Sequence, residues 1–242
     1  MPVHHIPHAS WADVYDLAYE HSFGLFYSEL TQTTIQLITE TLHTGGSILD
    51  FGAGTGRLSI PLAEKHFDVT AVDPCQEMLD QLALKKSKGM KIHTVCSTMQ
   101  DFKGCNFDFA LCVFTVLLYV LDENALNKAL SAAYSALKPE GRLLIDIPSR
   151  GIFQGYSTND ERMSRRVSVT PDNEDVYWYE EKLIVNRPGN DAMICSDRFR
   201  IRYWPDEVIR NALLSVGFIL QADLTHHFYG AGSQYWILKK IS

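Results

Sequence analysis

Residues 48–58 read ILDFGAGTGRL, an apolar run followed by three glycines within five positions and a further apolar pattern. The apolar run is typical of a buried strand, and the residues after the glycines predict a helix. Glycine lets the backbone turn tightly and lets a ligand approach the main chain, while a helix N-terminus offers unpaired amide donors to an anionic group. The stretch therefore predicts a strand–loop–helix unit that holds a ligand along its loop.

The spacing of the glycines distinguishes two kinds of nucleotide-binding loop. A dinucleotide loop follows G-x-G-x-x-G, and its third glycine would fall on Arg57. The chain instead has G-x-G-x-G, with Asp50 two residues before the first glycine. A second acid, Asp73, ends the next apolar run, where a carboxylate can accept hydrogen bonds from ribose hydroxyls. The loop and this acid together are more specific than the glycines alone.

The chain between residues 47 and 147 alternates apolar runs with helical patterns. Asp122 is predicted to cap a helix whose apolar face carries Leu126, Leu130, Ala133 and Leu137. Strand-like runs lie at residues 47–51, 68–73, 91–95, 107–114 and 142–147. Near-continuous apolar strands that alternate with helices predict a parallel sheet covered on both faces.

The flanking segments predict two additions to this sheet. Residues 10–44 predict one or two helices, and the polar residues 149–165 predict a loop. An antiparallel hairpin, a helix and two closing strands are predicted at residues 176–185 with 192–203, at 206–217, and at 218–223 with 234–239. We expect a single domain over 1–242, with a helical cap at 1–44 and an antiparallel lid at 150–205.

Composition and net charge limit the classes of protein to which the chain can belong. The chain has 242 residues, of which 46% are hydrophobic and 21% charged, and its net charge of −7 argues against a generic nucleic-acid coat. No apolar run approaches the ~18 residues of a membrane span, and no secretory signal pattern is visible. Five cysteines without a C-x-x-C pair favour a reduced protein over a disulfide scaffold or a zinc site. We expect a cytoplasmic monomer or homodimer with a small-molecule substrate, no membrane partner and no metal.

Four motifs, in order, resemble the class I S-adenosylmethionine-dependent methyltransferases: ILDFGAGTGR, AVDPCQEML, NFDFALCVFTVLLYV and LKPEGRLLI. The resemblance covers residues 45–148. It implies an α/β fold with a Rossmann-like, doubly wound sheet of seven mostly parallel strands, the last of them antiparallel. It also implies S-adenosyl-L-methionine as cofactor and S-adenosyl-L-homocysteine as product. The segment after the fifth strand is similar in architecture to the small antiparallel lids of some small-molecule methyltransferases.

The same resemblance assigns cofactor-binding roles. The glycine loop would line the methionine part of the cofactor with Asp50 below it, Asp73 would bind the ribose, and Pro74 and Met78 would lie near the adenine. Thr98 stands where the family usually has an Asp, and Asp101 is a nearby substitute. The full predicted set is Tyr15, Asp50, Gly52, Ala53, Gly54, Gly56, Arg57, Asp73, Pro74, Met78, Thr98, Met99, Gln100 and Cys112.

Structural alternatives stay open for several members of this set. The acids at the strand ends are also typical helix N-caps, and Met78 is compatible with plain helix core. Cys112 is favoured as a small packed residue because no His or cation adjoins it in sequence to lower its pKa. Tyr15 corresponds to a tyrosine that many members place near the cofactor, or to a packed aromatic side chain.

Substrate residues are predicted on the hairpin. Successive residues of a strand face opposite sides, so Tyr177 and Tyr179 share one face and Trp178 takes the other. Arg198, Arg200 and Arg202 also alternate, and we expect them to pair with Glu180 and Glu181 across the hairpin rather than to hold an acidic substrate. The predicted substrate set is Tyr177, Tyr179, Arg200 and Arg202.

Two further groups of histidines are candidate functional residues. His226 or His227 is the candidate general base, with a surface-loop position as the alternative. The histidines at 4, 5 and 8 predict a terminal arm and not a metal site, because no matching acid or thiol cluster adjoins them.

The expected activity is methyl transfer by in-line displacement to a nitrogen or oxygen of a small molecule. Residues 112–115 read CVFT and not the Asn/Asp-Pro-Pro-Tyr type, which argues against nucleic-acid and protein-amide acceptors. A nicotinamide-dependent oxidoreductase is one alternative, against which Arg57 in the third glycine position counts. A cofactor-binding module without turnover is the other.

Overall fold

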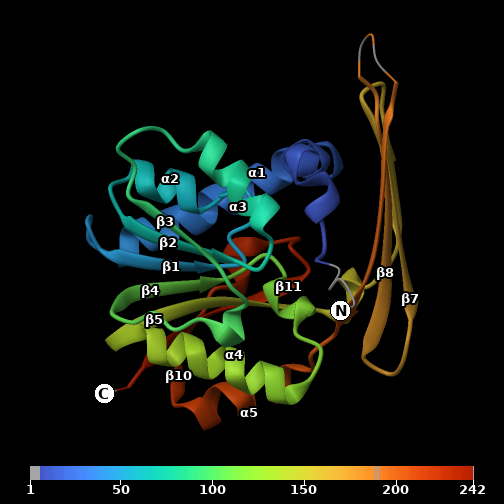
Figure 1. Cartoon of the computed structure of the whole chain (residues 1–242). Helices are drawn as coiled ribbons and strands as arrows, with labels where there is room; N and C mark the ends of the chain where they lie inside the picture. The colour runs from blue at the N-terminus through green and yellow to red at the C-terminus, as the bar shows by residue number, and fades with distance from the viewer. Residues whose placement is uncertain (1–5, 188, 190, 242) are drawn as a thin grey trace.

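The computed structural model describes residues 6–187, 189 and 191–241, and it arranges them around two β-sheets (Figure 1). The larger sheet has the strand order β10-β11-β5-β4-β1-β2-β3. Only β11 runs antiparallel to its neighbours within the described residues, which confirms the predicted fold class. Its strands are β1 (Ser47–Phe51), β2 (Asp68–Asp73), β3 (Ile92–Cys96), β4 (Phe107–Cys112), β5 (Leu137–Pro148), β10 (Phe218–Asp223) and β11 (Ser233–Lys240).

Both faces of this sheet are covered because its central strands are apolar on both sides. In β1, Ile48 and Leu49 are both fully buried, yet they belong to two different hydrophobic clusters. The helices α1 (Tyr15–Thr41), α2 (Ser59–Glu64) and α3 (Gln76–Lys85) lie on one face, and α4 (Glu123–Ala136) and α5 (Asp206–Val216) lie on the other (Figure 1). Asp122 caps α4 as predicted, since its carboxylate accepts a hydrogen bond of 2.8 Å from the amide of Ala125.

The N-terminal part forms a short 3-10 helix, η1 (Ala9–Val14), followed by α1. Gly24 interrupts α1 with a φ of +50°, a conformation that glycine adopts without the steric cost of a side chain. The sequence expectation of one or two helices over residues 10–44 therefore corresponds to one long helix with a kink.

The second sheet is antiparallel, with the order β6-β7-β8-β9. Its strands are β6 (Tyr156–Asn159), β7 (Met163–Pro171), β8 (Val176–Val185) and β9 (Met193–Arg202). The prediction of a loop over residues 149–165 is therefore wrong, because η4 (Arg150–Ile152), β6 and the start of β7 lie there. Arg165 explains the error: it is a charged residue at a fully buried strand position, so the apolar alternation of β7 is broken.

The four-stranded sheet stands beside the larger sheet, with the N-terminal segment between them (Figure 1). Trp11, Val14 and Ala18 pack against its inner face, where Leu183 and Cys195 are buried. The segment η3 (Val116–Tyr119), which follows β4, also reaches this face through Leu118. The inner face therefore lies opposite the carboxyl ends of the parallel strands. No helix in the described part of the chain is both long and apolar enough to traverse a bilayer.

Candidate functional site

The glycine loop after β1 uses its glycines in two different ways. Gly52 and Gly56 have φ values of +69° and +90°, and a β-carbon on them would clash with Val116 and Leu82 respectively. Gly54 has a φ of +52°, but a β-carbon there would meet no other atom within 4 Å. Gly52 and Gly56 therefore allow close packing within the protein, whereas Gly54 leaves the backbone open to an incoming ligand.

Asp73 ties this loop to the end of β2. One carboxylate oxygen accepts a hydrogen bond of 2.9 Å from the amide of Gly54, and the other accepts one of 2.8 Å from the amide of Cys75. Burial raises the pKa of Asp73, and these two hydrogen bonds oppose the rise. Cys75 and not Asp73 is the N-cap residue of α3, so the helix-cap alternative does not describe this acid.

Asp50 lies beneath the loop and is 3% exposed. The hydroxyl of Ser59, at the start of α2, donates a hydrogen bond of 2.6 Å to its carboxylate. Burial raises the pKa of Asp50 to about 6, with the Ser59 hydrogen bond acting in the opposite direction. The contact fixes the beginning of α2 against the end of β1.

The start of α1 is anchored over the same loop. The carboxylate of Asp16 accepts hydrogen bonds of 2.5 Å from the hydroxyl of Thr55 and 2.6 Å from Nζ of Lys85. Tyr15, the preceding residue, stacks on Trp11 and Tyr19 with ring centroids 5.3 and 4.4 Å apart. The sequence-predicted Tyr15 is thus placed beside the loop by a neighbour that binds the loop directly.

The residues predicted near an adenine ring line a second edge of the site. Met78 is buried in one cluster with Ala12 and Cys75, whereas Pro74 is exposed. The hydroxyl of Thr98 donates a hydrogen bond of 2.7 Å to Asp101, so a carboxylate does lie beside the position where the family usually has one. Met99, buried in η2 (Met99–Asp101), approaches Sγ of Cys112 at 3.8 Å, and Gln100 is half-buried. Burial raises the pKa of the Cys112 thiol.

Arg57 crosses from the loop to α1. Its guanidinium lies between two rings, 4.0 Å from the centroid of Tyr27 and 3.2 Å from that of Phe114. Nη1 also donates a hydrogen bond of 2.7 Å to Oγ1 of Thr31. The residue that excluded a dinucleotide loop therefore joins α1 to the segment after β4.

Asp146, at the end of β5, is a site residue that the sequence reasoning missed. It is fully buried, and the amide of Thr115 donates to both carboxylate oxygens at 3.0 and 3.2 Å. Phe114 and Thr115 both have positive φ, a conformation that costs free energy in residues other than glycine. Burial raises the pKa of Asp146 to about 7. An acid inside the apolar run LLIDIP (residues 143–148) was the feature that could have identified it.

Opposite the loop, the inner face of the four-stranded sheet carries acids among aromatic rings. Glu181 and Asp197 are 3% and 5% exposed, and Phe199 stacks on Tyr179 at 4.9 Å. Tyr119 of η3 lies 5.7 Å from Phe199 and keeps 41% of its surface accessible. We call Tyr119, Tyr179, Glu181, Asp197 and Phe199 the acid–aromatic cluster.

The charged pairs of this sheet differ between its two faces. Arg198 and Glu180 form the predicted cross-strand pair at 2.7 Å on the exposed face. The predicted pairing of Glu181 with these arginines is wrong, because Glu181 points to the other face. There its Oε1 accepts a hydrogen bond of 2.5 Å from Nε of the fully buried Arg165.

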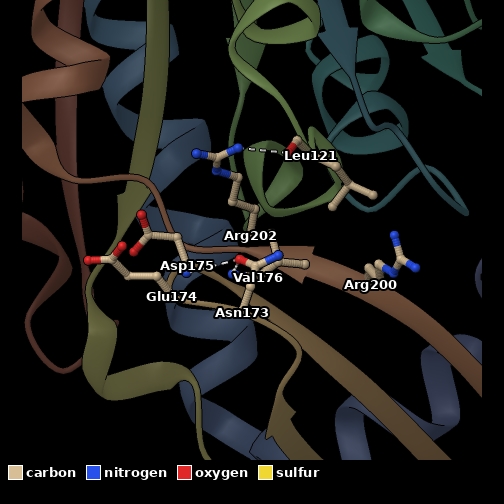
Figure 2. A pocket seen from close by; sticks show the side chains of 7 residues that line it. All are labelled: Leu121, Asn173, Glu174, Asp175, Val176, Arg200 and Arg202. Atoms are coloured by element: carbon tan, nitrogen blue, oxygen red, sulfur yellow. Dashed lines mark hydrogen bonds between the residues drawn. The ribbon is translucent and has the colours of Figure 1, made fainter.

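The four residues predicted to bind substrate do not gather at one place. Tyr179 belongs to the acid–aromatic cluster, whereas the hydroxyl of Tyr177 accepts a hydrogen bond of 2.9 Å from Arg150. Arg200 pairs with Asp172 at 3.3 Å, and Arg202 donates to the carbonyl of Leu121 at 2.9 Å. Figure 2 shows these two arginines in a separate hollow of about 330 Å³, whose other lining residues are Leu121, Asn173, Glu174, Asp175 and Val176.

The predicted general bases lie on η5 (Thr225–Phe228). His226 and His227 are both exposed, with ring centroids 4.0 Å apart, and His226 lines an open hollow of about 740 Å³. Of the terminal histidines, those at 4 and 5 lie outside the described residues, while His8 is buried. Among residues 6–187, 189 and 191–241, no three His, Cys, Asp or Glu side chains are grouped so that they could hold a metal ion.

Residues 48–141 match the family model described as a methyltransferase domain. Over these residues the chain is similar to methyltransferase domains. The chain is 34% identical over 141 residues to a putative methyltransferase of Bacillus subtilis, YqeM, and the match covers 57% of this chain and 54% of that protein. The chain thus spans about half the length of that curated relative.

Solved methyltransferases share the fold over nearly the whole chain. An S-adenosylmethionine-dependent methyltransferase from Clostridium acetobutylicum superposes with a TM-score of 0.83 at 20% identity, covering 95% of this chain and 99% of its own. An S-adenosylmethionine-bound amino pentose methyltransferase from Micromonospora echinaspora, CalS10, gives a TM-score of 0.74 at 20% identity, with coverages of 94% and 96%. The match over residues 48–141 supports the predicted methyltransferase class, and the solved structures support the predicted fold.

Proposed function

We propose that the protein moves a methyl group from S-adenosylmethionine to a nitrogen or oxygen of a small molecule, by in-line displacement. The observation that carries the proposal is the joint geometry of Gly54 and Asp73. Gly54 leaves open space above the loop backbone, and its amide is bonded to a buried acid at the end of the neighbouring strand. This is the arrangement that a nucleoside with a charged tail requires.

The residues of the site fit this cofactor. The open backbone of the glycine loop would receive the methionine part, and the remaining lone pairs of Asp73 would accept the ribose hydroxyls. Tyr15 would cover the site from α1, which Asp16 anchors to the loop. When bound, S-adenosylmethionine supplies a methyl group already activated on a sulfonium centre.

The chain itself must therefore position the acceptor and exclude water, and alignment alone can supply much of the acceleration. We propose that the cap (1–44) and the lid (150–205) do this, because η1 and the inner face of the four-stranded sheet pack against one another beside the loop. A small acceptor agrees with the negative net charge, and the amino pentose acted on by CalS10 is of this size class. We also propose a cytoplasmic location, in keeping with the free cysteines of the described chain.

Calorimetric titration with S-adenosylmethionine, S-adenosylhomocysteine and NAD tests the proposal. We expect the first two to bind and NAD not to bind. Asp73→Ala should weaken S-adenosylmethionine by about 5- to 150-fold, because hydrogen bonds to a charged group contribute ~1–3 kcal/mol. Asp68→Ala, at the exposed beginning of the same strand, is the matched control and should leave the affinity unchanged.

Two results would contradict the proposal: binding of NAD alone, or equal cofactor affinity in Asp73→Ala and the unmodified protein. Because Asp73 also holds the amides of Gly54 and Cys75, the melting temperature of each variant must be recorded alongside. Release of S-adenosylhomocysteine in the presence of small amines and alcohols then tests turnover.

A further inference from the structure

The acid–aromatic cluster holds a side chain of the protein's own N-terminal segment. The imidazole of His8, which is 6% exposed, lies 4.9 Å from the ring of Trp11 and 5.0 Å from that of Phe199. Its Nε2 is hydrogen-bonded to the hydroxyl of Tyr119 at 2.9 Å. Its Nδ1 lies 3.7 Å from Glu181 and 3.9 Å from Asp197. A nitrogen base is therefore seated between two carboxylates and a set of aromatic rings.

We propose that the acid–aromatic cluster is the recognition site for a protonated nitrogen group of the methyl acceptor, and that His8 occupies it until the acceptor binds. The inference rests on the proposed methyl transfer and names its substrate class: small molecules that carry an amine or an imidazole-like ring. Recognition of this cation involves no covalent step.

The cluster has more carboxylates than cations. Glu181 and Asp197 bring two carboxylates to the inner face, and Arg165 supplies one positive charge through its bond to Glu181 Oε1. The Nη1 of Arg165 is directed away, toward Ala18 and Ser22 of α1. Oε2 of Glu181 is buried and has no hydrogen-bond partner among the described residues. A buried carboxylate oxygen in this position is strongly favoured by an added cationic donor.

The rings of the cluster suit the same ligand. The faces of Tyr and Phe rings attract cations within about 6 Å of their centroids. Phe199 and Tyr119 lie 5.0 and 6.1 Å from the imidazole centroid, and Tyr179 stacks behind Phe199. Aromatic faces and carboxylates on one side of a site favour a cation over a neutral alcohol of equal shape, and they exclude an anion.

The position of the cluster connects it to methyl transfer. Tyr119 belongs to η3, which follows β4, and it keeps 41% of its surface accessible while its hydroxyl contacts His8. The neighbouring residue Leu118 packs on Phe199 and Ile201 of β9. The cluster therefore bridges the carboxyl edge of the parallel sheet, where the cofactor is proposed to bind, and the lid.

His8 is suited to being displaced. Its φ is +66°, in the left-handed region that residues other than glycine avoid. It precedes η1, whose N-terminus has no side-chain cap hydrogen bond. The main-chain amide of His8 also donates a hydrogen bond of 2.6 Å to Asp197, so an acceptor takes the place of the imidazole while this backbone contact can remain.

Vacating the cluster tests the proposal directly. In His8→Ala, titration with imidazole at pH 6, in the presence of saturating S-adenosylhomocysteine, should show binding at least about tenfold tighter than in the unmodified protein. The reason is that a site occupied by its own side chain binds a ligand only in the fraction of molecules where it is vacant. Benzoate and benzyl alcohol, as an anion and a neutral ring, should not gain affinity.

Asp197→Asn in the His8→Ala background should abolish the gain, and Phe199→Leu should reduce it. Arg198→Gln is the matched control, because Arg198 adjoins Asp197 on β9 but lies on the exposed face, and it should leave the gain intact. Equal imidazole affinity with and without His8, or an equal gain for benzyl alcohol, would overturn the proposal. Circular dichroism and melting temperature establish that each variant is folded.

A turnover experiment separates this inference from the proposed function. Before transfer, the bound ammonium must give its proton to a carboxylate of the cluster so that the nitrogen lone pair becomes free to attack. With S-adenosylmethionine, methylation of benzylamine should then exceed that of benzyl alcohol, and Asp197→Asn should lower kcat/KM for the amine by about tenfold without changing cofactor affinity. If the cofactor does not bind, the proposed function fails. If the cofactor binds but amines are not preferred and Asp197→Asn has no effect, only the cation site fails.

Discussion

The glycine loop and the acid–aromatic cluster face each other, but they are built from different chemical groups. The loop consists of eleven consecutive residues, 48–58, and presents mainly backbone groups, with Gly54 open to a ligand. The cluster draws single side chains from η3, β8 and β9, which are up to 80 residues apart between Tyr119 and Phe199. The loop is thus defined locally, whereas the cluster exists only once two sheets and the N-terminal segment are assembled.

Their buried acids show the same contrast. Asp73 in the first region is satisfied by the amides of Gly54 and Cys75, which any residue types there would supply. Glu181 in the second region depends on one side chain, that of Arg165. If the cluster binds the acceptor as proposed, we expect substitutions there to change acceptor recognition without disturbing the glycine loop. Loss of the buried ion pair should instead destabilise the fold.

The largest expected effect comes from breaking that ion pair. Glu181→Ala should lower the free energy of unfolding by about 3–5 kcal/mol, because it leaves the buried guanidinium of Arg165 without its carboxylate. Glu180→Ala, one residue away in β8, removes the exposed partner of Arg198 and should cost at most about 1 kcal/mol. Urea unfolding of both variants measures the difference. Similar losses in the two would show that burial does not distinguish the faces of this sheet.

The contrast between the regions also explains how far the sequence could predict them. The positions of most strands followed from apolar runs, and the fold class of the larger sheet followed from the family resemblance. The bounds of β1, β2, β8 and β10 coincide with the predicted ranges. The backbone groups of these strands are hydrogen-bonded within a sheet, and their apolar side chains are buried. Both features leave a periodic pattern in the sequence.

The parts that were missed depend on buried polar side chains. Strand β7 was missed because Arg165 stands at a core position, and Asp146 was missed because an acid in an apolar strand has no local partner. Their partners, Glu181 and the amide of Thr115, lie 16 and 31 residues away. Pairings between residues so far apart in sequence follow from the assembled fold and not from the local pattern. The same holds for the position of His8 in the acid–aromatic cluster.

The glycine loop can be tested by comparing two of its own glycines. Gly52→Ala should destabilise the protein by about 2–4 kcal/mol, because the left-handed backbone and the clash with Val116 act together. Gly54→Ala should cost only about 1 kcal/mol, since its β-carbon meets open space.

In Gly54→Ala the loss should fall on the cofactor instead, with S-adenosylmethionine weakened by at least about tenfold, or ~1.4 kcal/mol. Thermal unfolding and calorimetric titration of both variants give the two quantities. Unchanged cofactor affinity in Gly54→Ala would mean that the open side of the loop is not the binding side.

Asp146 lies between the two regions. Its substitution is expected to have the smallest of the three effects on stability, and this effect depends on pH. Burial raises its pKa to about 7, whereas in the unfolded chain it titrates near 3.9. Between these two pKa values the folded state holds a proton that the unfolded state has lost, so the free energy of unfolding falls as the pH rises from about 4 to about 7. Asp146→Asn resembles the protonated acid at every pH. Its free energy of unfolding, relative to that of the unmodified protein, should rise by about 2 kcal/mol between pH 5 and pH 8.

Asp108 provides a control of opposite sign for this last comparison. Partial burial acts to raise the pKa of the Asp108 carboxyl, but hydrogen bonds from Lys138 and Ser47 outweigh this effect, so the pKa is lowered. The stability that Asp108 contributes is therefore fully present above its unfolded pKa and is lost only in more acidic solution. Asp108→Asn should differ from the unmodified protein by a constant amount between pH 5 and 8, as measured by urea unfolding across that range. A constant difference for Asp146→Asn as well would mean that the acid is ionised throughout, so that the positive-φ turn at Phe114 and Thr115 is held by a buried carboxylate and not by a neutral acid.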